Sequence, residues 1–320
     1  MGTTVTAPAP TPSFSRDGLV FNIPNDCRGP YLPLCGLHYR MGAEGHDGDV
    51  TPHQASSRSV AWEVAPDVHC LGPLGRTQTN VYFVHADSSW ALIDAAWTKD
   101  GPLIKEAAEV LFGTDARAAA ILLTHSHPDH AGSALQLAQA WKCPVYVHSR
   151  ELPLATGDFS AMTEYAGPLD NWLILPIMRA VGQRRRDAIL ARSNLGPVVR
   201  VLEPDAGVPG LPGWQCIPTP GHTPGHISFF RNSDHVLITG DAVVTMELNS
   251  LSGLLRQRPG LSKPPWYTTW NRSVARESII TLAGLEPTVL AGGHGVPMTG
   301  PETASALCDF AGIAGVTRPS

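Results

Sequence analysis

From about residue 60 onward, short apolar runs alternate with turn residues and with segments of helical spacing. The apolar runs predict strands at residues 63–65, 80–84, 90–94, 118–123, 144–148, 198–202, 214–218, 227–230, 236–239 and 288–291. Apolar positions at helical spacing predict helices at residues 99–112, 131–141 and 273–285. Because strands and helices alternate along the chain, we expect an α/β layered fold.

Two segments depart from this alternation. Residues 1–58 are rich in proline, glycine and polar residues, which predicts an extension that lies on the main domain or is partly disordered rather than a separate core. We assign residues 59–320 to the main domain. Within that domain, residues 150–196 form a mainly helical insertion with apolar positions, for which we expect a cap over the functional site. The run Arg184-Arg185-Arg186 in this cap is interpreted as a solvated helix face.

Ligand-type side chains are densest directly after the apolar run at residues 118–123. The stretch Thr124-His125-Ser126-His127-Pro128-Asp129-His130 places three imidazoles and one carboxylate within six residues. His125 and His127 lie two apart in extended chain and therefore point the same way, as two ligands of one ion must. Asp129 and His130 begin the next helix after Pro128, so they can reach a separate ion from a rigid element. The pattern predicts a metal site.

Later strands also end in polar clusters. Gly221-His222-Thr223-Pro224-Gly225-His226 precedes the strand at 227–230, Asp241 follows the strand at 236–239, and His294 follows the strand at 288–291. Asp94 closes an earlier buried strand. All these candidate ligands are imidazole or carboxylate, which suits zinc and leaves iron, manganese or a mixed pair open.

The composition and net charge limit the classes of molecule that the protein is expected to bind. The 320 residues are 43% hydrophobic and 16% charged, so the chain can bury a large core. The net charge of −5 gives no excess of positive charge for binding nucleic acid or an anionic membrane. We expect a small-molecule substrate, no nucleic-acid or membrane partner, and compatibility with a homodimer. The six scattered cysteines lack a CxxC pair and predict reduced thiols in a cytoplasmic protein.

With its complete HxHxDH motif and the later His, Asp and His in order, the sequence resembles the metallo-β-lactamase-fold hydrolase superfamily. The resemblance covers about residues 60–300. It implies an αββα sandwich, two mixed β-sheets flanked by helices, with two divalent metal ions at one edge. It further implies that His125, His127 and His222 hold one ion. Asp129, His130 and His294 then hold the other, and Asp241 bridges them.

Two metals bracketing a water lower its pKa to about 7, which supplies hydroxide at neutral pH, and the same ions polarise a scissile carbonyl. The predicted catalytic carboxylates are Asp129, Asp241 and Asp94. Asp94 is expected to orient a ligating imidazole or the loop that carries it. In relatives with the TPGHTPGH motif the first histidine, here His222, binds metal, so the second, His226, is predicted to be structural.

Other residues receive smaller roles. Thr124 and Gly240 are expected to shape the loops of the site. The predicted surface or ordinary polar histidines, none of them a ligand, are His38, His46, His53, His148 and His235.

The substrate is the least determined feature. Asp241 stands where many class B1 lactamases carry cysteine, and His130 completes the DH pair, so the chain resembles the glyoxalase II and lactonase-like branch. The region after Gly300 contains one arginine, a departure from glyoxalase II that argues against glutathione thioesters. Trp266, Tyr267 and Trp270 suggest lipophilic walls, or else they pack the cap onto the sandwich. Tyr165 or Tyr267 is a candidate donor to the developing oxyanion.

Three functional classes therefore remain. The leading hypothesis is a dinuclear hydrolase of a lactone, ester or thioester, with β-lactam cleavage as a variant. The second is a phosphodiesterase or nuclease of the same superfamily, which the acidic balance disfavours. The third is a non-hydrolytic metal or redox protein. Diiron redox relatives place a glutamate where this chain has His127, and no flavin-binding domain follows.

Overall fold

A computed structural model describes residues 14–15, 18–19, 60–87 and 89–312. Contacts divide the chain into two units, Met1–Ala55 and Ser56–Ser320. In the first unit, β1 (Phe14–Ser15) pairs antiparallel with β2 (Gly18–Leu19). The remainder of the predicted extension lies outside the described residues, as do His38, His46 and His53. The second unit contains both large sheets.

The larger sheet has seven strands in sequence order. They are β3 (Trp62–Ala65), β4 (Val68–Leu74), β5 (Thr79–Ala86), β6 (Ser89–Ile93), β7 (Ala120–Leu122), β8 (Val145–His148) and β9 (Val199–Leu202). Neighbours from β3 to β6 pair antiparallel, and those from β6 to β9 pair parallel. The parallel strands run in one direction, so the chain following β6 and the chain following β7 emerge at the same edge of the sheet.

The second sheet has five strands in the order β10-β11-β12-β15-β16. They are β10 (Trp214–Pro218), β11 (Ile227–Arg231), β12 (Val236–Gly240), β15 (Val289–Gly292) and β16 (Met298–Thr299). Only β12 and β15 pair parallel in this sheet. Beside it, β13 (Val244–Met246) pairs with β14 (Pro259–Ser262).

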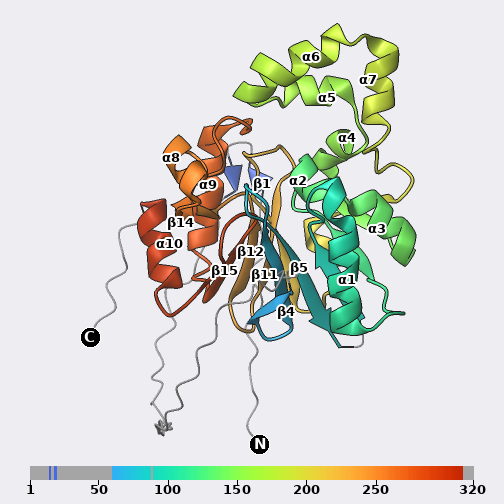
Figure 1. Cartoon of the computed structure of the whole chain (residues 1–320). Coiled ribbons are helices and arrows are strands. Elements are labelled where there is room, and N and C mark those ends of the chain that lie inside the picture. The colour runs from blue at the N-terminus through green and yellow to red at the C-terminus, as the bar shows by residue number, and fades with distance from the viewer. Residues whose placement is uncertain (1–13, 16–17, 20–59, 88, 313–320) are drawn as a thin grey trace, which may run out of the picture. The chain divides into compact units, whose positions relative to one another are not determined.

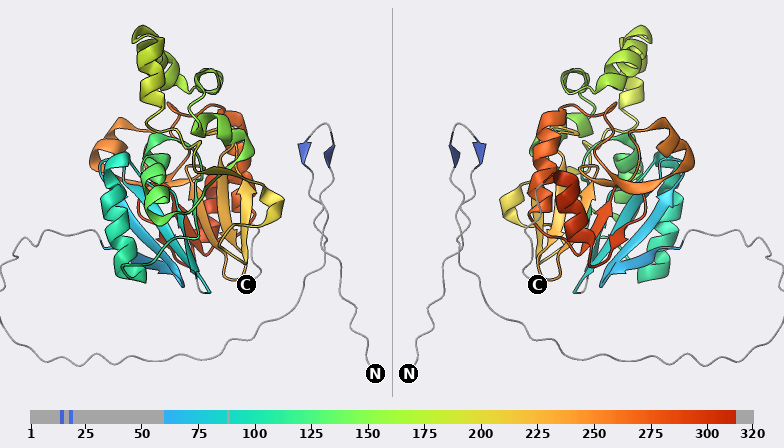
Figure 2. Two further views of the ribbon diagram at one scale, coloured as in Figure 1. Left: turned by 90° about the vertical axis from the view of Figure 1, so that its right-hand side faces the viewer. Right: turned by 90° about the vertical axis from the view of Figure 1, so that its left-hand side faces the viewer.

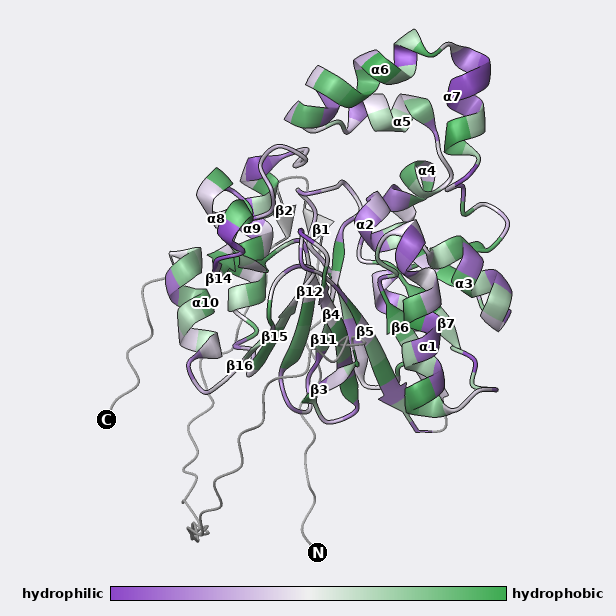
Figure 3. Ribbon diagram, viewed as in Figure 1, coloured by the Kyte–Doolittle hydropathy of each residue, from purple (hydrophilic) through white to green (hydrophobic). Residues whose placement is uncertain are grey.

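Side chains of the central strands alternate between two apolar layers. On β7, Leu122 enters the core between the two sheets, together with Phe229 and Ile238 of the second sheet. Its neighbour Ile121 faces the other way, toward a cluster with α1 (Gly101–Phe112) and α3 (Ala134–Trp141). Strands buried on both faces read as continuous apolar runs, which explains their visibility in the sequence (Figure 3).

Helices cover the outer face of each sheet. On the second sheet, Leu237 and Leu290 pack against α9 (Arg272–Ala283) and α10 (Thr303–Ala311). Figure 1 shows α1 and α3 on one side of the sheets and α9 and α10 on the other. The layers are therefore helix, sheet, sheet and helix, and the predicted αββα sandwich is confirmed.

The predicted insertion contains helices. They are the 3-10 helix η2 (Ser149–Glu151), α4 (Leu152–Ala155), α5 (Phe159–Glu164), the π-helix η3 (Asp170–Ile174), α6 (Leu175–Ala180) and α7 (Gln183–Leu190). We call residues 150–196 the cap. Figure 2 shows α6 and α7 projecting beyond the sandwich in both views. Across the described residues, no helix has the length and apolar character to cross a membrane.

The arginine run of the cap is only partly solvated. Arg184 and Arg185 are exposed, as expected, but Arg186 is half-buried with its guanidinium carbon 4.2 Å from the ring centroid of Phe159. The prediction of a fully solvated face is therefore wrong for Arg186, because its planar cation stacks on an aromatic ring.

One predicted helix is divided. Residues 131–141 were expected to form a single helix, but the chain forms α2 (Pro128–Ala131) and α3, separated at Gly132 and Ser133. A side chain at Gly132 would lie within 2.5 Å of the Thr98 nitrogen and 2.7 Å of the Ala96 oxygen. Close approach of this neighbouring backbone explains the break, because tertiary contact overrides the local helical pattern.

Several elements lack a clear pattern and were not predicted. Besides β1, β2, β4, β13, β14, β16 and α10, they are α8 (Leu251–Arg256) and the 3-10 helix η4 (Pro204–Ala206), whereas the 3-10 helix η1 (Thr98–Asp100) overlaps the start of the helix predicted at 99–112. Most are short. Strand β4 is interrupted by Gly72-Pro73, which hides its strand character.

Candidate metal centre

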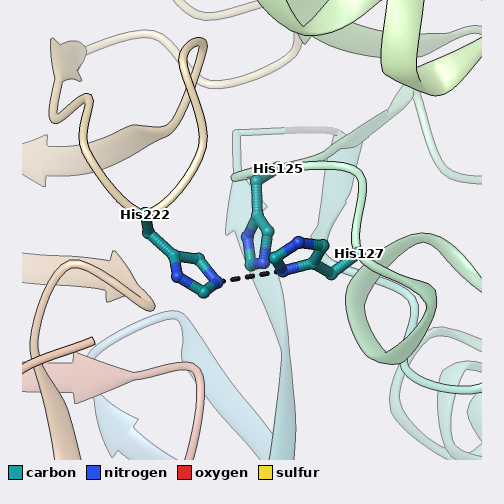
Figure 4. A group of neighbouring side chains, drawn as sticks. All are labelled: His125, His127 and His222. Atoms are coloured by element: carbon teal, nitrogen blue, oxygen red, sulfur yellow. Dashed lines mark hydrogen bonds between the residues drawn. The ribbon is translucent and has the colours of Figure 1, made fainter. Parts of the chain in front are cut away.

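The first ligand group contains three histidines from two loops. His125 and His127 follow β7, and His222 lies between β10 and β11. One nitrogen from each lies within 4.8 Å of the others. His127 Nδ1 is 3.0 Å from His222 Nε2, and Figure 4 shows the three rings converging. The two loops are 95 residues apart at this contact, yet they present their nitrogens to one point.

The second group contains one carboxylate and two histidines. Asp129 and His130 lie in α2, and His294 follows β15. Their ligand-type atoms also lie within 4.8 Å of one another. His294 Nε2 is 3.4 Å from His130 Nε2 and 3.6 Å from an oxygen of Asp129. Both groups match the sets that the motif order implies.

Asp241 lies between the two groups and faces both. Its Oδ2 is 3.3 Å from His222 Nε2 of the first group. Its Oδ1 is 3.3 Å from the Nε2 atoms of both His130 and His294. Each carboxylate oxygen thus faces a different ligand group, which is the arrangement expected of a bridging ligand.

Fixed acceptors set the orientation of two histidines of the centre through their Nδ1 atoms. His130 Nδ1 donates to Asp94 Oδ2 at 2.8 Å, and His294 Nδ1 donates to the Thr77 carbonyl at 2.8 Å. Because these partners only accept, Nδ1 keeps its proton, and the neutral form of each ring has its lone pair on Nε2. Asp94 therefore contacts a candidate ligand, and Thr77 is a positioning group that sequence reasoning missed.

Threonine hydroxyls act in the same way on two histidines of the first group, His125 and His222. Thr124 Oγ1 donates to Asp94, so it accepts from His125 Nδ1 at 3.0 Å. Thr269 Oγ1 donates to the Pro265 carbonyl, so it accepts from His222 Nδ1 at 3.2 Å. Such partners fix the tautomer and the orientation of a metal-ligating imidazole.

Burial and neighbouring charge move the pKa values of two histidines in the first group and of two in the second in opposite directions. Burial, followed by neighbouring histidines, holds the pKa values of His125 and His222 well below the usual range. Burial also opposes charge on His130 and His294, but the carboxylates of Asp241 and its neighbours outweigh it and raise both pKa values. These histidines in turn hold the pKa of Asp241 well below its usual range despite its burial.

His226 supports Asp241 and belongs to neither ligand group. Its Nε2 accepts from the backbone N–H of Asp241 at 3.0 Å, so its Nδ1 donates to Thr219 Oγ1 at 2.8 Å. Burial lowers its pKa to about 3, so it stays neutral. Gly240 has φ +52°, and a side chain there would come within 2.7 Å of the Thr124 side chain. The close approach of Thr124 and Gly240 shapes the centre.

Glu151 was not identified from the sequence. It is buried, and it accepts hydrogen bonds from Ser126 in the first histidine loop and from Thr223 and Gly225 in the second. Its position three residues after a short strand was the one available signal. That signal is weak, because a glutamate entering a helix is usually a solvated residue.

The aromatic segment 264–270 joins the centre to the cap. Trp270 donates its backbone N–H to the His222 carbonyl, and its ring meets Tyr165 of the cap edge-on with centroids 5.4 Å apart. The Tyr267 carbonyl accepts from the Leu169 backbone N–H at 2.7 Å. Trp270 therefore packs the cap onto the sandwich, whereas Trp266 keeps 46% of its surface exposed.

The remaining sequence candidates contact ordinary backbone groups. His148 Nδ1 accepts from the Arg150 N–H, and His235 Nδ1 contacts the Leu285 and Glu286 carbonyls. Neither belongs to a candidate ligand group. The cysteines that the structure describes, Cys70, Cys143, Cys216 and Cys308, are free thiols, and Cys27 and Cys35 lie outside the described residues.

The residues present fit divalent metal ions. His125 Nε2 and Asp241 Oδ1 are buried without hydrogen-bond partners. Leaving a buried acceptor without a hydrogen bond costs folding free energy, but its free lone pair can bind a cation. The donor set of imidazole nitrogens and carboxylate oxygens suits zinc, iron or manganese.

Comparison with known proteins agrees with this geometry. Residues 74–294 match the family model of the metallo-beta-lactamase superfamily. The chain is 40% identical over 285 residues to the probable metallo-hydrolase YflN of Bacillus subtilis, covering 88% of this chain and 97% of the relative. It is 28% identical over 123 residues to the hydroxyacylglutathione hydrolase GloC of Haemophilus influenzae, covering 38% and 49%.

A solved structure supports the fold independently. The metallo-beta-lactamase family protein TTHA1429 from Thermus thermophilus superimposes with a TM-score of 0.55 at 21% identity, covering 78% of this chain and 80% of that one. The family match spans most of the second unit and includes every proposed ligand from His125 to His294. The chain therefore belongs to the metallo-beta-lactamase superfamily.

Proposed function

We propose that this protein is a dinuclear metal-dependent hydrolase of a small lipophilic carbonyl compound, namely a lactone, ester or thioester. The observation that carries the proposal is the position of Asp241, whose two oxygens each face a different ligand group at 3.3 Å. The two ligand groups and Asp241 would hold two divalent cations, with zinc as the default, and such ions would supply Lewis acidity and lower the pKa of water to about 7.

The protein's own residues prepare the centre for this chemistry. Asp94 holds the proton of His130 on Nδ1, and the Thr77 carbonyl does the same for His294, so Nε2 of each ring is the nitrogen that faces Asp241 and is left to bind a metal ion. Because both histidines are already oriented, little reorganisation is needed during the reaction.

Tyr267 is the favoured donor to the developing oxyanion. Its pKa is raised by burial and then by the nearby carboxylates of Asp241 and Asp129, so the phenol keeps its proton and lies in the electrostatic range of the centre. The pKa of Tyr165 is also raised, but its first cause is a hydrogen bond to Glu164, and no candidate ligand is among its causes. A phenol that remains protonated can donate to negative charge on a substrate oxygen.

Three observations favour carbonyl substrates. The relatives named metallo-hydrolase YflN and hydroxyacylglutathione hydrolase GloC support hydrolysis, the second of a thioester. An aspartate stands at position 241 rather than a cysteine, which separates this centre from many class B1 lactamases. Trp266 offers a half-exposed apolar surface beside Tyr267, with ring centroids 5.8 Å apart.

We also propose a cytoplasmic location, supported by the free thiols.

The proposal is tested by metal content and a substrate panel. Purified chain is expected to contain about two divalent ions, and chelation is expected to abolish hydrolysis until metal is restored. Acyl lactones, aryl esters, acyl thioesters, a β-lactam reporter and a phosphodiester are compared at equal concentration. Turnover of any of them by verified metal-free protein contradicts the mechanism, and sole cleavage of the phosphodiester or the β-lactam contradicts the substrate class.

A further inference from the structure

Glu151 is a buried carboxylate whose partners are all neutral donors. It is 1% exposed and lies at the end of η2, where β8 passes into the cap. Its Oε1 accepts from the Ser126 N–H at 2.9 Å. Its Oε2 accepts from the Thr223 hydroxyl at 2.9 Å and from the Gly225 N–H at 3.1 Å. A buried carboxylate is retained only where such donors compensate its desolvation.

The three donors belong to the two loops that carry the first ligand group. Ser126 stands between His125 and His127, and Thr223 directly follows His222. The two oxygens of Glu151 divide between these loops, with Oε1 on the first and Oε2 on the second. One side chain therefore fixes the spacing of two loops that are far apart in sequence.

Packing reinforces this link on the second loop. A side chain at Gly225 would come within 2.4 Å of the Glu151 nitrogen and 2.9 Å of its Cβ. The loop thus lies directly against the backbone of Glu151. Gly225 also precedes His226, which holds the backbone of Asp241. Displacement of Glu151 is expected to reach the His222 ligand directly, because His222 belongs to the loop that Glu151 holds.

We propose that Glu151 is a positioning residue that joins the two histidine loops of the first metal site and links their spacing to the base of the cap. The proposal rests on the metal centre of the proposed function. The carboxylate acts through the Ser126, Thr223 and Gly225 donors and touches neither metal nor substrate. Its loss therefore acts on the first ligand group, His125, His127 and His222, more than on the second.

Glu151→Gln is the sharpest single change. It keeps the shape of the side chain but replaces one acceptor oxygen by an NH₂ group. In one orientation that NH₂ meets the N–H of Ser126, and in the other it meets the N–H of Gly225. Either way one loop loses its acceptor, because two donors cannot pair.

The readout is binding of Co²⁺ to metal-free protein, followed by visible absorbance and by competition with a chelator. Wild-type protein is expected to bind two ions. In Glu151→Gln, one binding step is expected to weaken about 10- to 100-fold while the other changes little, the usual range for partners that orient ligands. Glu277→Gln is the matched control, because Glu277 is an exposed carboxylate on α9.

Each result has a distinct meaning. Failure of wild-type protein to bind two ions contradicts the proposed function. Two ions in wild type with equal affinities in Glu151→Gln overturn the positioning role, even if thermal unfolding of the metal-free variant shifts. If Glu151→Gln does not fold, Thr223→Val removes a single donor. A smaller loss in the same binding step is then expected, and wild-type affinity in Thr223→Val overturns the proposal.

Discussion

The metal end of the sandwich and the cap are built on opposite principles. At the metal end, buried polar side chains such as Asp94, Thr124 and His226 are tied to one another or to backbone by hydrogen bonds. In the cap, Trp172 and Ile177 are 79% and 51% exposed. One region is held by many specific polar contacts, and the other presents apolar surface to its surroundings.

From this difference we expect the metal end to govern the chemistry and the cap to govern substrate selectivity. Connected, buried polar groups hold a ligand set to one geometry, so substitutions there are expected to act on metal affinity and turnover together. Exposed apolar side chains contribute little to stability, so substitutions in and around the cap are expected to act on substrate preference. The predictions below test that separation, from the largest expected effect to the smallest.

Asp241→Asn is expected to have the largest effect. It removes the charge that both ligand groups share while keeping the side chain's shape, so kcat/KM is expected to fall more than about 100-fold and metal content below two ions per chain. Elemental analysis and steady-state kinetics measure both. Asp234→Asn is a control at the other end of β12, where Asp234 pairs with Arg231 at the surface. An active, fully metallated Asp241→Asn contradicts the bridging role.

Asp94→Asn is expected to act through His130. Asp94 has φ +61°, which asparagine also tolerates, so the backbone is preserved. When the amide oxygen of the asparagine stays on the Thr124 N–H, its NH₂ group faces His130 and cannot accept the Nδ1 proton, so that ring favours the other tautomer and Nε2 is blocked. We expect a loss of about 10- to 100-fold in metal affinity. Chelator competition measures it, and an unchanged affinity would show that Asp94 does not orient the ligand.

Tyr267→Phe removes one proposed hydrogen bond to the reacting substrate. A single such bond contributes about 1 kcal/mol, which corresponds to about fivefold in kcat. The value of KM is expected to stay constant, because the bond strengthens as charge develops on the oxygen. Tyr165→Phe is the matched control from the cap and is expected to leave kcat unchanged. Equal losses in the two variants would count against Tyr267 as the donor.

Trp266→Ala is expected to have the smallest effect and to depend on the substrate. Burying about 30 Å² of an acyl chain against the indole contributes about 0.7 kcal/mol, so KM rises about threefold for long acyl esters. Short acyl esters are expected to show no change, and kcat is expected to be preserved. A large fall in kcat for both chain lengths would show that Trp266 acts on the chemistry of the metal end rather than on substrate preference.

Local pattern was sufficient for most of the fold. The strands around Ile121, Ile93 and Ile238 are buried on both faces, so their continuous apolar runs were visible in the sequence. The helix predicted at 131–141 was wrong as a single element, because contact with the Ala96 and Thr98 backbone divides it at Gly132. Short elements such as β13 and α8 carry too few residues for a periodic signal.

The sequence by itself determined the candidate ligands, because spacing within residues 124–130 and the order of the later histidines and aspartate are local facts. Only the tertiary structure decided how those ligands are oriented. The contacts of Thr269 with His222, of Glu151 with Thr223 and of Thr77 with His294 join residues 47, 72 and 217 positions apart. No local pattern encodes such pairs, because they form only when the packing of two sheets brings distant strand ends together.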